Sequence, residues 1–378
     1  MNNLLIDNDN SIYKNYCHHH IKFKSTDNID SYISTVIIPQ LLKHDFSTLY
    51  IKDNLSSNYL ELQGIILAYH IRLSKELKEK RFVPIVILSD ITRDTLNKIN
   101  PIARILFTKN IYLIPNTTEA IKKFQTRKLE TLKENEFNSH FLDLITVAPP
   151  ENSTSHSIAN EWAIERWANL LNLDTLAIRE NRDKISSMLY VKYLRYKYNL
   201  ENSSTSNIKK KPLNGKLLFI DDRGKDGWND IVESYLNLHY DGMEFKGFGD
   251  NDFLDIDTIQ RELKKVIEKY EPNVIVLDLR LLKGETTDKI NNISGMKILD
   301  FIKKENPSIQ IIMFTASSDS LILDSIHDKG ILGYVKKDAP TKRYTTSKSS
   351  FKRLDSLIKD RSFSYNFKLI TRNISQVS

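Results

Sequence analysis

Residues 274–281 read VIVLDLRL, in which a continuous apolar run ends at an acid, Asp278. Short runs of this kind are typical of strands buried on both faces of a parallel sheet. Similar runs are LLFI, which ends at Asp221 and Asp222, and IIMF, which ends at Thr315. Helical patterns separate these runs, and this alternation predicts βαβ units with helices on both faces of one sheet.

The alternation continues over residues 216–359 and predicts a flavodoxin-like wound sheet, an α/β fold of five parallel strands and five helices. We place the strands at 216–220, 243–248, 274–277, 309–314 and 333–335. We place the helices at 227–238, 256–270, 295–304, 318–329 and 349–359. In this fold the functional side chains lie at the carboxyl ends of the strands.

Five polar side chains follow the predicted strands, namely Asp221, Asp222, Asp278, Thr315 and Lys337. Parallel strands end at the same edge of a sheet, so we expect these side chains to lie together. Three clustered carboxylates repel one another unless a cation compensates them, and their hard oxygens suit Mg²⁺. A carboxylate beside Mg²⁺ can accept a phosphoryl group while a lysine and a hydroxyl bind the phosphoryl oxygens.

With these residue types in this order, residues 216–359 resemble a response-regulator receiver domain. The resemblance implies that Asp278 accepts a phosphoryl group from a sensor histidine kinase or a phosphotransfer protein. It also implies that Mg²⁺ is bound by Asp221, Asp222, Asp278 and the backbone carbonyl of Arg280. Beyond self-phosphorylation and dephosphorylation that depend on Mg²⁺, it implies no enzyme activity.

The resemblance further implies that Thr315 and Lys337 contact the phosphoryl group and that Tyr334 is the aromatic side chain that changes rotamer on activation. One feature departs from the family. Receivers usually carry a proline and then a glycine soon after the acceptor, whereas here Gly295 comes late and no proline precedes it. We interpret residues 283–294 as an insertion, which is either a plain surface loop or a lid over the acceptor.

The first half resembles a degenerate copy of the second. LLIDND at residues 4–9 is similar to LLFIDD, and TLYI (48–51), VPIVIL (83–88) and IYLI (111–114) are typical of strands, with an amphipathic helix at 60–78. Gly64 falls where Gly295 lies, and Ser89 where Thr315 lies. Asp7 and Asn8 supply one carboxylate instead of two, Lys52 or Asp53 takes the acceptor position, and no lysine ends the fifth strand. We therefore predict a degenerate pseudo-receiver, in which phosphorylation is poor.

Composition divides the chain further. Ten of the eleven glycines lie from Gly215 onward. We expect an α/β pseudo-receiver-like domain at 1–150, a helical segment at 151–200 with helices at 157–171 and 175–198, a polar linker at 201–214, a receiver domain at 215–362 and a tail at 363–378.

Of 378 residues, 40% are hydrophobic and 27% charged, which is ordinary globular composition. No apolar run is long enough to span a membrane, so we expect a cytoplasmic protein without membrane contact. Too few residues follow the receiver for a DNA-binding output domain, which favours output through a downstream protein partner, or a role as connector or phosphate sink. A homodimer is compatible with the sequence.

The alternative is a phosphorylation-regulated nucleic-acid-binding protein, which the net charge of +7 permits. It would use the basic side chains of the helical segment, namely Arg179, Arg182, Lys184, Lys192, Arg195 and Lys197. A solvated helix face explains the same charges.

Overall fold

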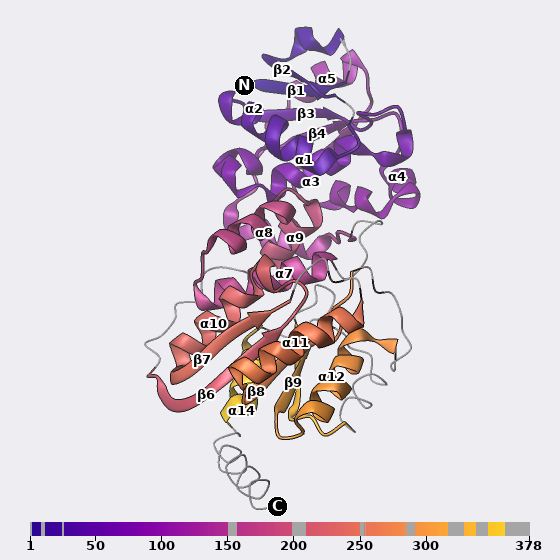
Figure 1. Cartoon of the computed structure of the whole chain (residues 1–378). Coiled ribbons are helices and arrows are strands. Elements are labelled where there is room, and N and C mark those ends of the chain that lie inside the picture. The colour runs from indigo at the N-terminus through magenta and orange to yellow at the C-terminus, as the bar shows by residue number, and fades with distance from the viewer. Residues whose placement is uncertain are drawn as a thin grey trace, which may run out of the picture. The chain divides into compact units, whose positions relative to one another are not determined.

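The computed structural model describes residues 2–8, 12–24, 26–149, 157–198, 209–249, 253, 255–283, 285, 292–316, 329–337 and 347–359. The chain divides into two compact units: unit 1 is Met1–Asn152 with Ser186–Asn199, and unit 2 is Ser153–Ile185 with Leu200–Ser378. Each unit is built on its own five-stranded parallel sheet (Figure 1). The prediction of two α/β units with parallel sheets and additional helical segments is confirmed.

The sheet of unit 2 has the strand order β7-β6-β8-β9-β10, in which the first strand in sequence lies between the second and the third. This is the flavodoxin-like order. The strands are β6 (Lys211–Ile220), β7 (Tyr240–Phe248), β8 (Val274–Asp278), β9 (Gln310–Thr315) and β10 (Gly333–Lys336). Strands β6 and β7 begin earlier than predicted. They pair with each other from Lys211 and Tyr240, several residues before β6 begins to pair with β8 at Leu217.

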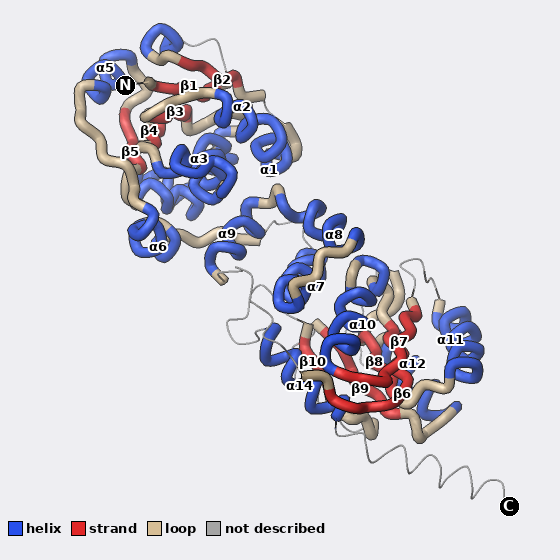
Figure 2. The backbone as a smooth tube through the Cα atoms, turned by 90° about the vertical axis from the view of Figure 1, so that its left-hand side faces the viewer, coloured by secondary structure: helices blue, strands red, loops and turns tan. Residues whose placement is uncertain are grey.

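Successive side chains of these strands point to opposite faces of the sheet. Leu217 and Phe219 face a core formed with α7, α10 and α14, whereas Leu218 and Ile220 face a core formed with α11 and α12. Figure 2 shows the strands between these two groups of helices. Both faces are covered by apolar side chains, which explains why the strands read as continuous apolar runs.

The helices of unit 2 are α7 (Ser157–Leu171), α8 (Leu176–Ser186), α10 (Trp228–His239), α11 (Ile256–Tyr270), α12 (Ser294–Glu305) and α14 (Ser347–Lys359), with a short 3₁₀ turn η8 (Gly224–Asp226). Asp255 caps α11 by accepting a hydrogen bond from the Thr258 N–H at 2.7 Å. The helix predicted at 318–329, except Lys329, lies outside the described residues, as do the tail at 363–378 and the linker up to residue 208.

The helical segment predicted at 151–200 is divided between the two units. Helices α7 and α8 belong to unit 2, whereas α9 (Leu189–Lys197) belongs to unit 1. The single helix expected at 175–198 is interrupted at Met188, which has an extended backbone. Asp30 accepts a hydrogen bond from the Leu189 N–H at 2.9 Å, and buried Lys192 donates to Ser34, Ser74 and His70. These contacts bind α9 into unit 1.

The sheet of unit 1 has the order β2-β1-β3-β4-β5, again with every pair parallel. Its strands are β1 (Asn3–Asp7), β2 (His19–Lys22), β3 (Thr48–Lys52), β4 (Ile85–Leu88) and β5 (Ile111–Ile114). On one face, Leu5, Tyr50 and Val86 pack with Ile121 and Phe124. The latter two belong to α5, so this helix covers that face.

Unit 1 has many short helical turns. Besides α9, its α-helices are α1 (Ile29–Tyr32), α2 (Ile38–Lys43), α3 (Gln63–Leu73), α4 (Arg93–Ile99), α5 (Thr118–Gln125) and α6 (Phe137–His140). The remaining turns are η1 (Ile12–Tyr16), η2 (Ile33–Ile37), η3 (Tyr59–Glu61), η4 (Lys75–Phe82), η5 (Pro101–Phe107), η6 (Glu134–Glu136) and η7 (Leu142–Leu144). The helix expected at 60–78 is shorter, because Leu62 before α3 has a positive φ angle and Ser74 after it has an extended backbone.

No helix in the described part of the chain is both long enough and apolar enough to cross a membrane.

Candidate functional site

Three carboxylates meet at the carboxyl edge of the unit 2 sheet. Asp221 follows β6 directly, Asp222 is next to it, and Asp278 is the last residue of β8. Each offers one oxygen, and these three oxygens lie within 4.8 Å of one another. The strands bring the groups together because Ile220 pairs with Leu277 in the parallel register. The predicted convergence of these three acids is therefore present.

Lys337 lies among the carboxylates. Its Nζ donates to Asp221 Oδ2 at 2.7 Å and is 3.3 Å from Asp278 Oδ1. The lysine side chain is 4% exposed, so these ion pairs are shielded from water. Its ammonium also lies 5.3 Å from the centre of the Trp228 ring and 5.2 Å from that of Phe314. One lysine charge therefore faces three acids.

The electrostatics of the cluster are those of a site that needs a further cation. Burial, together with the charges of Asp221 and Asp222, raises the pKa of Asp278 to about 8, although Lys337 opposes the rise. Burial and the charge of Asp221 raise the pKa of Asp222 to about 6. Burial lowers the pKa of Lys337, but the carboxylates outweigh it and the net shift is upward. Hard oxygen ligands with this excess of negative charge fit Mg²⁺.

Of the other predicted site residues, Thr315 and Arg280 lie at the same edge, whereas Tyr334 lies within β10. Thr315 is the last residue of β9, is buried, and its carbonyl accepts a hydrogen bond from the Lys337 N–H at 2.8 Å. Arg280 lies two residues beyond Asp278, and its Nη1 donates to the Glu285 carbonyl at 3.0 Å. Tyr334 of β10 is half-buried and packs against the core beneath α11 and α12, which is the opposite face from Trp228.

The predicted insertion at 283–294 is described at Lys283, Glu285 and its carboxyl end. The Glu285 carboxylate accepts hydrogen bonds from both the N–H and the hydroxyl of Ser294, the N–H bond being 2.8 Å long. Ser294 is the first residue of α12, so Glu285 satisfies a backbone N–H group that has no partner within that helix. The Ser294 hydroxyl also accepts from the Leu281 N–H at 2.7 Å. The base of the insertion is thereby fixed near the candidate acceptor.

Gly295 lets α12 approach the acceptor strand closely. A Cβ atom at this position would lie 2.4 Å from the carbonyl oxygen of Asp278. Gly64 has the same role in unit 1, where a Cβ atom would lie 1.9 Å from the carbonyl oxygen of Lys52. The two glycines thus place Lys52 in the position of Asp278.

Strand register extends this equivalence across both sheets. Ile6 pairs with Ile51 in unit 1 as Ile220 pairs with Leu277 in unit 2. The remaining pairs equate Asp7 with Asp221, Asn8 with Asp222, Ser89 with Thr315 and Asn116 with Lys337. Of the two alternatives left open by the sequence, the acceptor position is held by Lys52 and not by Asp53.

The carboxyl edge of the unit 1 sheet, where these equivalent residues differ from those of unit 2, lacks the features of a phosphoryl acceptor. Lys52 Nζ donates to Asn8 Oδ1 at 3.4 Å, and Asp7 pairs with His20 at 2.7 Å. Asp53 accepts hydrogen bonds from the Tyr59 hydroxyl and the Asn54 N–H. An ammonium group stands where a nucleophilic carboxylate would be needed, so this edge cannot form an acyl phosphate at that position.

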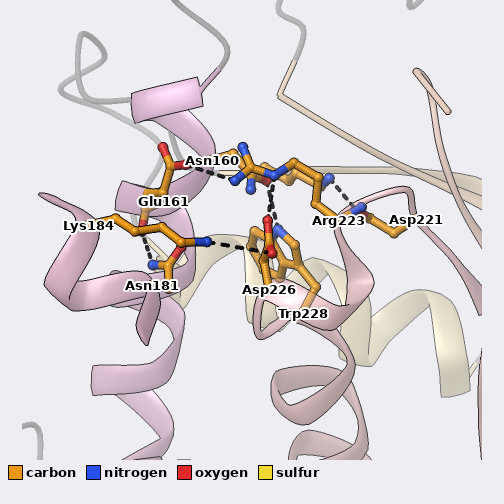
Figure 3. Close-up of polar contacts among 9 residues, drawn as sticks. Asn160, Glu161, Asn181, Lys184, Asp221, Arg223, Asp226 and Trp228 are labelled. Atoms are coloured by element: carbon orange, nitrogen blue, oxygen red, sulfur yellow. Dashed lines mark hydrogen bonds and ion pairs between the residues drawn. The ribbon is translucent and has the colours of Figure 1, made fainter. Parts of the chain in front are cut away.

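Sequence reasoning missed the contacts between the acidic edge and α7. Arg223, directly after Asp222, forms ion pairs with Glu161 of α7 at 2.8 Å and with Asp226 at 2.7 Å (Figure 3). The Trp228 Nε1–H donates to Asn160 Oδ1 of α7 at 2.8 Å. The two pairs with α7 join residues that are 62 and 68 positions apart, and no local pattern indicates such pairs.

The basic side chains considered for nucleic-acid binding do not form one described surface. Arg182 and Arg179 face Asp174 at 3.2 and 3.9 Å, and Lys184 lies 3.8 Å from Asp226. Lys192 is buried in unit 1, which also holds the rest of α9. The set is therefore divided between two units and largely paired with acids or buried.

Comparison with known families supports the interpretation of the first half. The family model of the inactive receiver domain matches residues 1–114. The prediction of a degenerate receiver at the amino terminus is confirmed over that range. The resemblance of residues 216–359 to an active receiver lies outside the match and stays a prediction. No curated protein matches the chain.

Solved structures similar to the chain include a signal receiver domain from Vibrio parahaemolyticus, at 16% identity and a TM-score of 0.30, covering 42% of this chain and 98% of that one. A LuxR-family two-component response regulator from Aurantimonas sp. SI85-9A1 has 16% identity and a TM-score of 0.28, covering 39% and 87%. RcsB from Salmonella enterica serovar Typhimurium, bound to promoter rprA, has 23% identity and a TM-score of 0.25, covering 34% and 62%.

Proposed function

We propose that the protein is a two-component response regulator whose unit 2 accepts a phosphoryl group on Asp278, and whose unit 1 is an inactive receiver domain. The observation that carries the proposal is the joint placement of Asp221, Asp222, Asp278 and Lys337 at one sheet edge. An isolated acid after a strand is commonly a helix cap. Three acids that share a lysine and surround one point have the composition of a phosphoryl-transfer site.

The residues would divide the chemistry among themselves. Asp221, Asp222 and Asp278, with the Arg280 carbonyl, would hold Mg²⁺, which supplies positive charge against the carboxylates and the phosphoryl oxygens. One Asp278 oxygen forms the new bond to phosphorus, while the bond from phosphorus to the donor breaks and the donor leaves with its electron pair. The Lys337 ammonium and the Thr315 hydroxyl bind the transferred oxygens.

The phosphoryl donor is a sensor histidine kinase or a phosphotransfer protein. The output is contact with a downstream protein, or else the protein serves as a connector or as a phosphate sink. Unit 1 supports an output by protein contact. It keeps the parallel sheet and the close approach of Gly64 to β3, but it has Lys52 in place of the acceptor aspartate. The basic helices give less support to nucleic-acid binding as output, since their charges are divided and paired.

Phosphorylation tests the proposal directly. The full chain is incubated with Mg²⁺ and acetyl phosphate, and the intact mass is measured for the wild type, Asp278→Asn and the matched control Asp53→Asn. We expect one phosphoryl group on the wild type and on Asp53→Asn, and none on Asp278→Asn. The proposal fails when the wild type gains no phosphate or when Asp278→Asn gains as much.

A further inference from the structure

Helix α7 is part of the core of unit 2 and not a surface appendage. Trp167 is fully buried, and its ring centre lies 4.1 Å from that of Phe351, 5.4 Å from Phe314 and 5.6 Å from Trp228. Phe314 immediately precedes Thr315, and Trp228 lies beneath the Lys337 ammonium. The apolar face of α7 therefore supports the residues that form the acidic site.

Two polar contacts fix the amino-terminal turns of α7 next to that site. The indole N–H of Trp228 donates to Asn160 Oδ1 at 2.8 Å, and the next residue, Glu161, pairs with Arg223 at 2.8 Å. The Glu161 side chain is 10% exposed and that of Arg223 24% exposed, so this pair is better shielded than a surface salt bridge. Asn181 of α8 donates to the Glu161 carbonyl at 3.0 Å and holds the same turn.

Arg223 is a cation placed beside the metal ligands. It follows Asp222 in sequence, and the backbone N–H of Arg223 donates to Asp221 Oδ1 at 2.9 Å. Figure 3 shows its guanidinium directed toward Glu161 and Asp226 and away from Asp221. The Arg223 charge already acts on the Asp222 carboxylate, where it opposes the rise in pKa. A guanidinium without Glu161 and Asp226 would be drawn further toward the cluster and would compete there with a divalent cation.

We propose that Glu161 is a positioning residue of the Mg²⁺ site, acting through Arg223, so that metal binding and the docking of α7 stabilise each other. The inference rests on the proposed function of the acidic cluster. Glu161 neutralises Arg223 and keeps its guanidinium off Asp221 and Asp222, which leaves these oxygens for Mg²⁺. By linkage, Mg²⁺ on the carboxylates removes the competing attraction for Arg223 and strengthens its pair with Glu161.

A double-mutant cycle in Mg²⁺ affinity tests this role. The dissociation constant for Mg²⁺ is measured by titration calorimetry on the full chain for Glu161→Gln, Arg223→Gln, the double variant and the control Arg179→Gln. Arg179 lies on α8 in an exposed pair with Asp174 at 3.9 Å. We expect Glu161→Gln to weaken Mg²⁺ binding by about threefold to tenfold. This is less than the usual effect of removing a residue that hydrogen-bonds directly to a metal ligand, because Asp226 still pairs with Arg223.

The direction of the change in Mg²⁺ affinity in the other variants distinguishes a positioning role from general structural damage. Arg223→Gln should bind Mg²⁺ at least as tightly as the wild type, and the double variant should match Arg223→Gln. Hydrogen exchange supplies a second readout: Mg²⁺ should slow exchange in α7 of the wild type and of Arg179→Gln, but not in Arg223→Gln. Arg223→Gln binding as weakly as Glu161→Gln would overturn the inference, and so would equal affinity of Glu161→Gln and the wild type. A wild type that binds no Mg²⁺ contradicts the proposed function itself.

Discussion

The stability of unit 2 should depend on pH through Asp278, and the neutral variant Asp278→Asn isolates that dependence. Burial chiefly raises the pKa of this carboxyl from an ordinary value of 3.8 to about 8. The unfolded chain loses the proton near pH 4, whereas the folded chain keeps it until about pH 8. Because the unfolded state binds fewer protons in this range, the free energy of unfolding falls as the pH rises from about 4 to about 8.

The structure sets the size of the effect. A rise of about 4 pKa units corresponds to at most about 6 kcal/mol, at about 1.4 kcal/mol per unit. Relaxation and water entry reduce the penalty of a buried charge, so we expect about 2 kcal/mol of lost stability between pH 5 and pH 8 in the absence of divalent ions. For a unit of this size, that is a fall in Tm of about 4 to 8 °C.

The assay is thermal unfolding of the full chain followed by calorimetry in EDTA and in Mg²⁺. In EDTA the transition of unit 2 should fall with rising pH in the wild type and change less in Asp278→Asn. In the proposed function Mg²⁺ would bind the ionised carboxylates, so it should raise Tm more at pH 8 than at pH 6. A wild type and an Asp278→Asn variant with the same pH dependence in EDTA would refute the reasoning.

Four further substitutions test separate contacts. Lys337→Met leaves the buried Asp221 and Asp278 without their cation, so it should cost about 3 kcal/mol of stability in denaturant unfolding in EDTA, and less in Mg²⁺; equal losses in both buffers would contradict the ion-pair account. Gly295→Ala forces α12 away from Asp278 and should lower both the Tm of unit 2 and its phosphate gain, whereas Gly64→Ala should lower only the Tm of unit 1; a shift of both transitions in either variant would argue against it. Lys192→Met removes the donor that binds Ser34, Ser74 and His70, and hydrogen exchange should then rise in α9 but not in α7; unchanged exchange in α9 would show that apolar packing alone holds this helix.

Much of unit 2 is predictable because its strands obey simple rules. Apolar runs such as VIVL and IIMF are buried on both faces, and parallel strands end together, so the meeting of Asp221, Asp222 and Asp278 follows from sequence order alone. The strand ends are less predictable. Thr315 belongs to β9, and β6 begins at Lys211, because neighbouring strands supply pairing partners that no local pattern shows.

The features that could not be predicted from the sequence depend on contacts between residues far apart in the chain. The break before α9 follows from the hydrogen bond of Leu189 to Asp30, about 160 residues away in sequence. The choice between Lys52 and Asp53 needed the register of β3 and the close approach of Gly64. The ion pair of Arg223 with Glu161 likewise joins separate elements and leaves no periodic signal.

Lys52 carries a consequence for how the whole chain responds to ions. A covalently attached ammonium in unit 1 stands in place of the Asp278 carboxylate, which in the proposed function would help to bind a diffusible ion. In the proposed function, therefore, only unit 2 would respond to the ion, and the two units would not cooperate in ion binding. Saturation of the chain with Mg²⁺ should then follow a simple hyperbola with a Hill coefficient of about one.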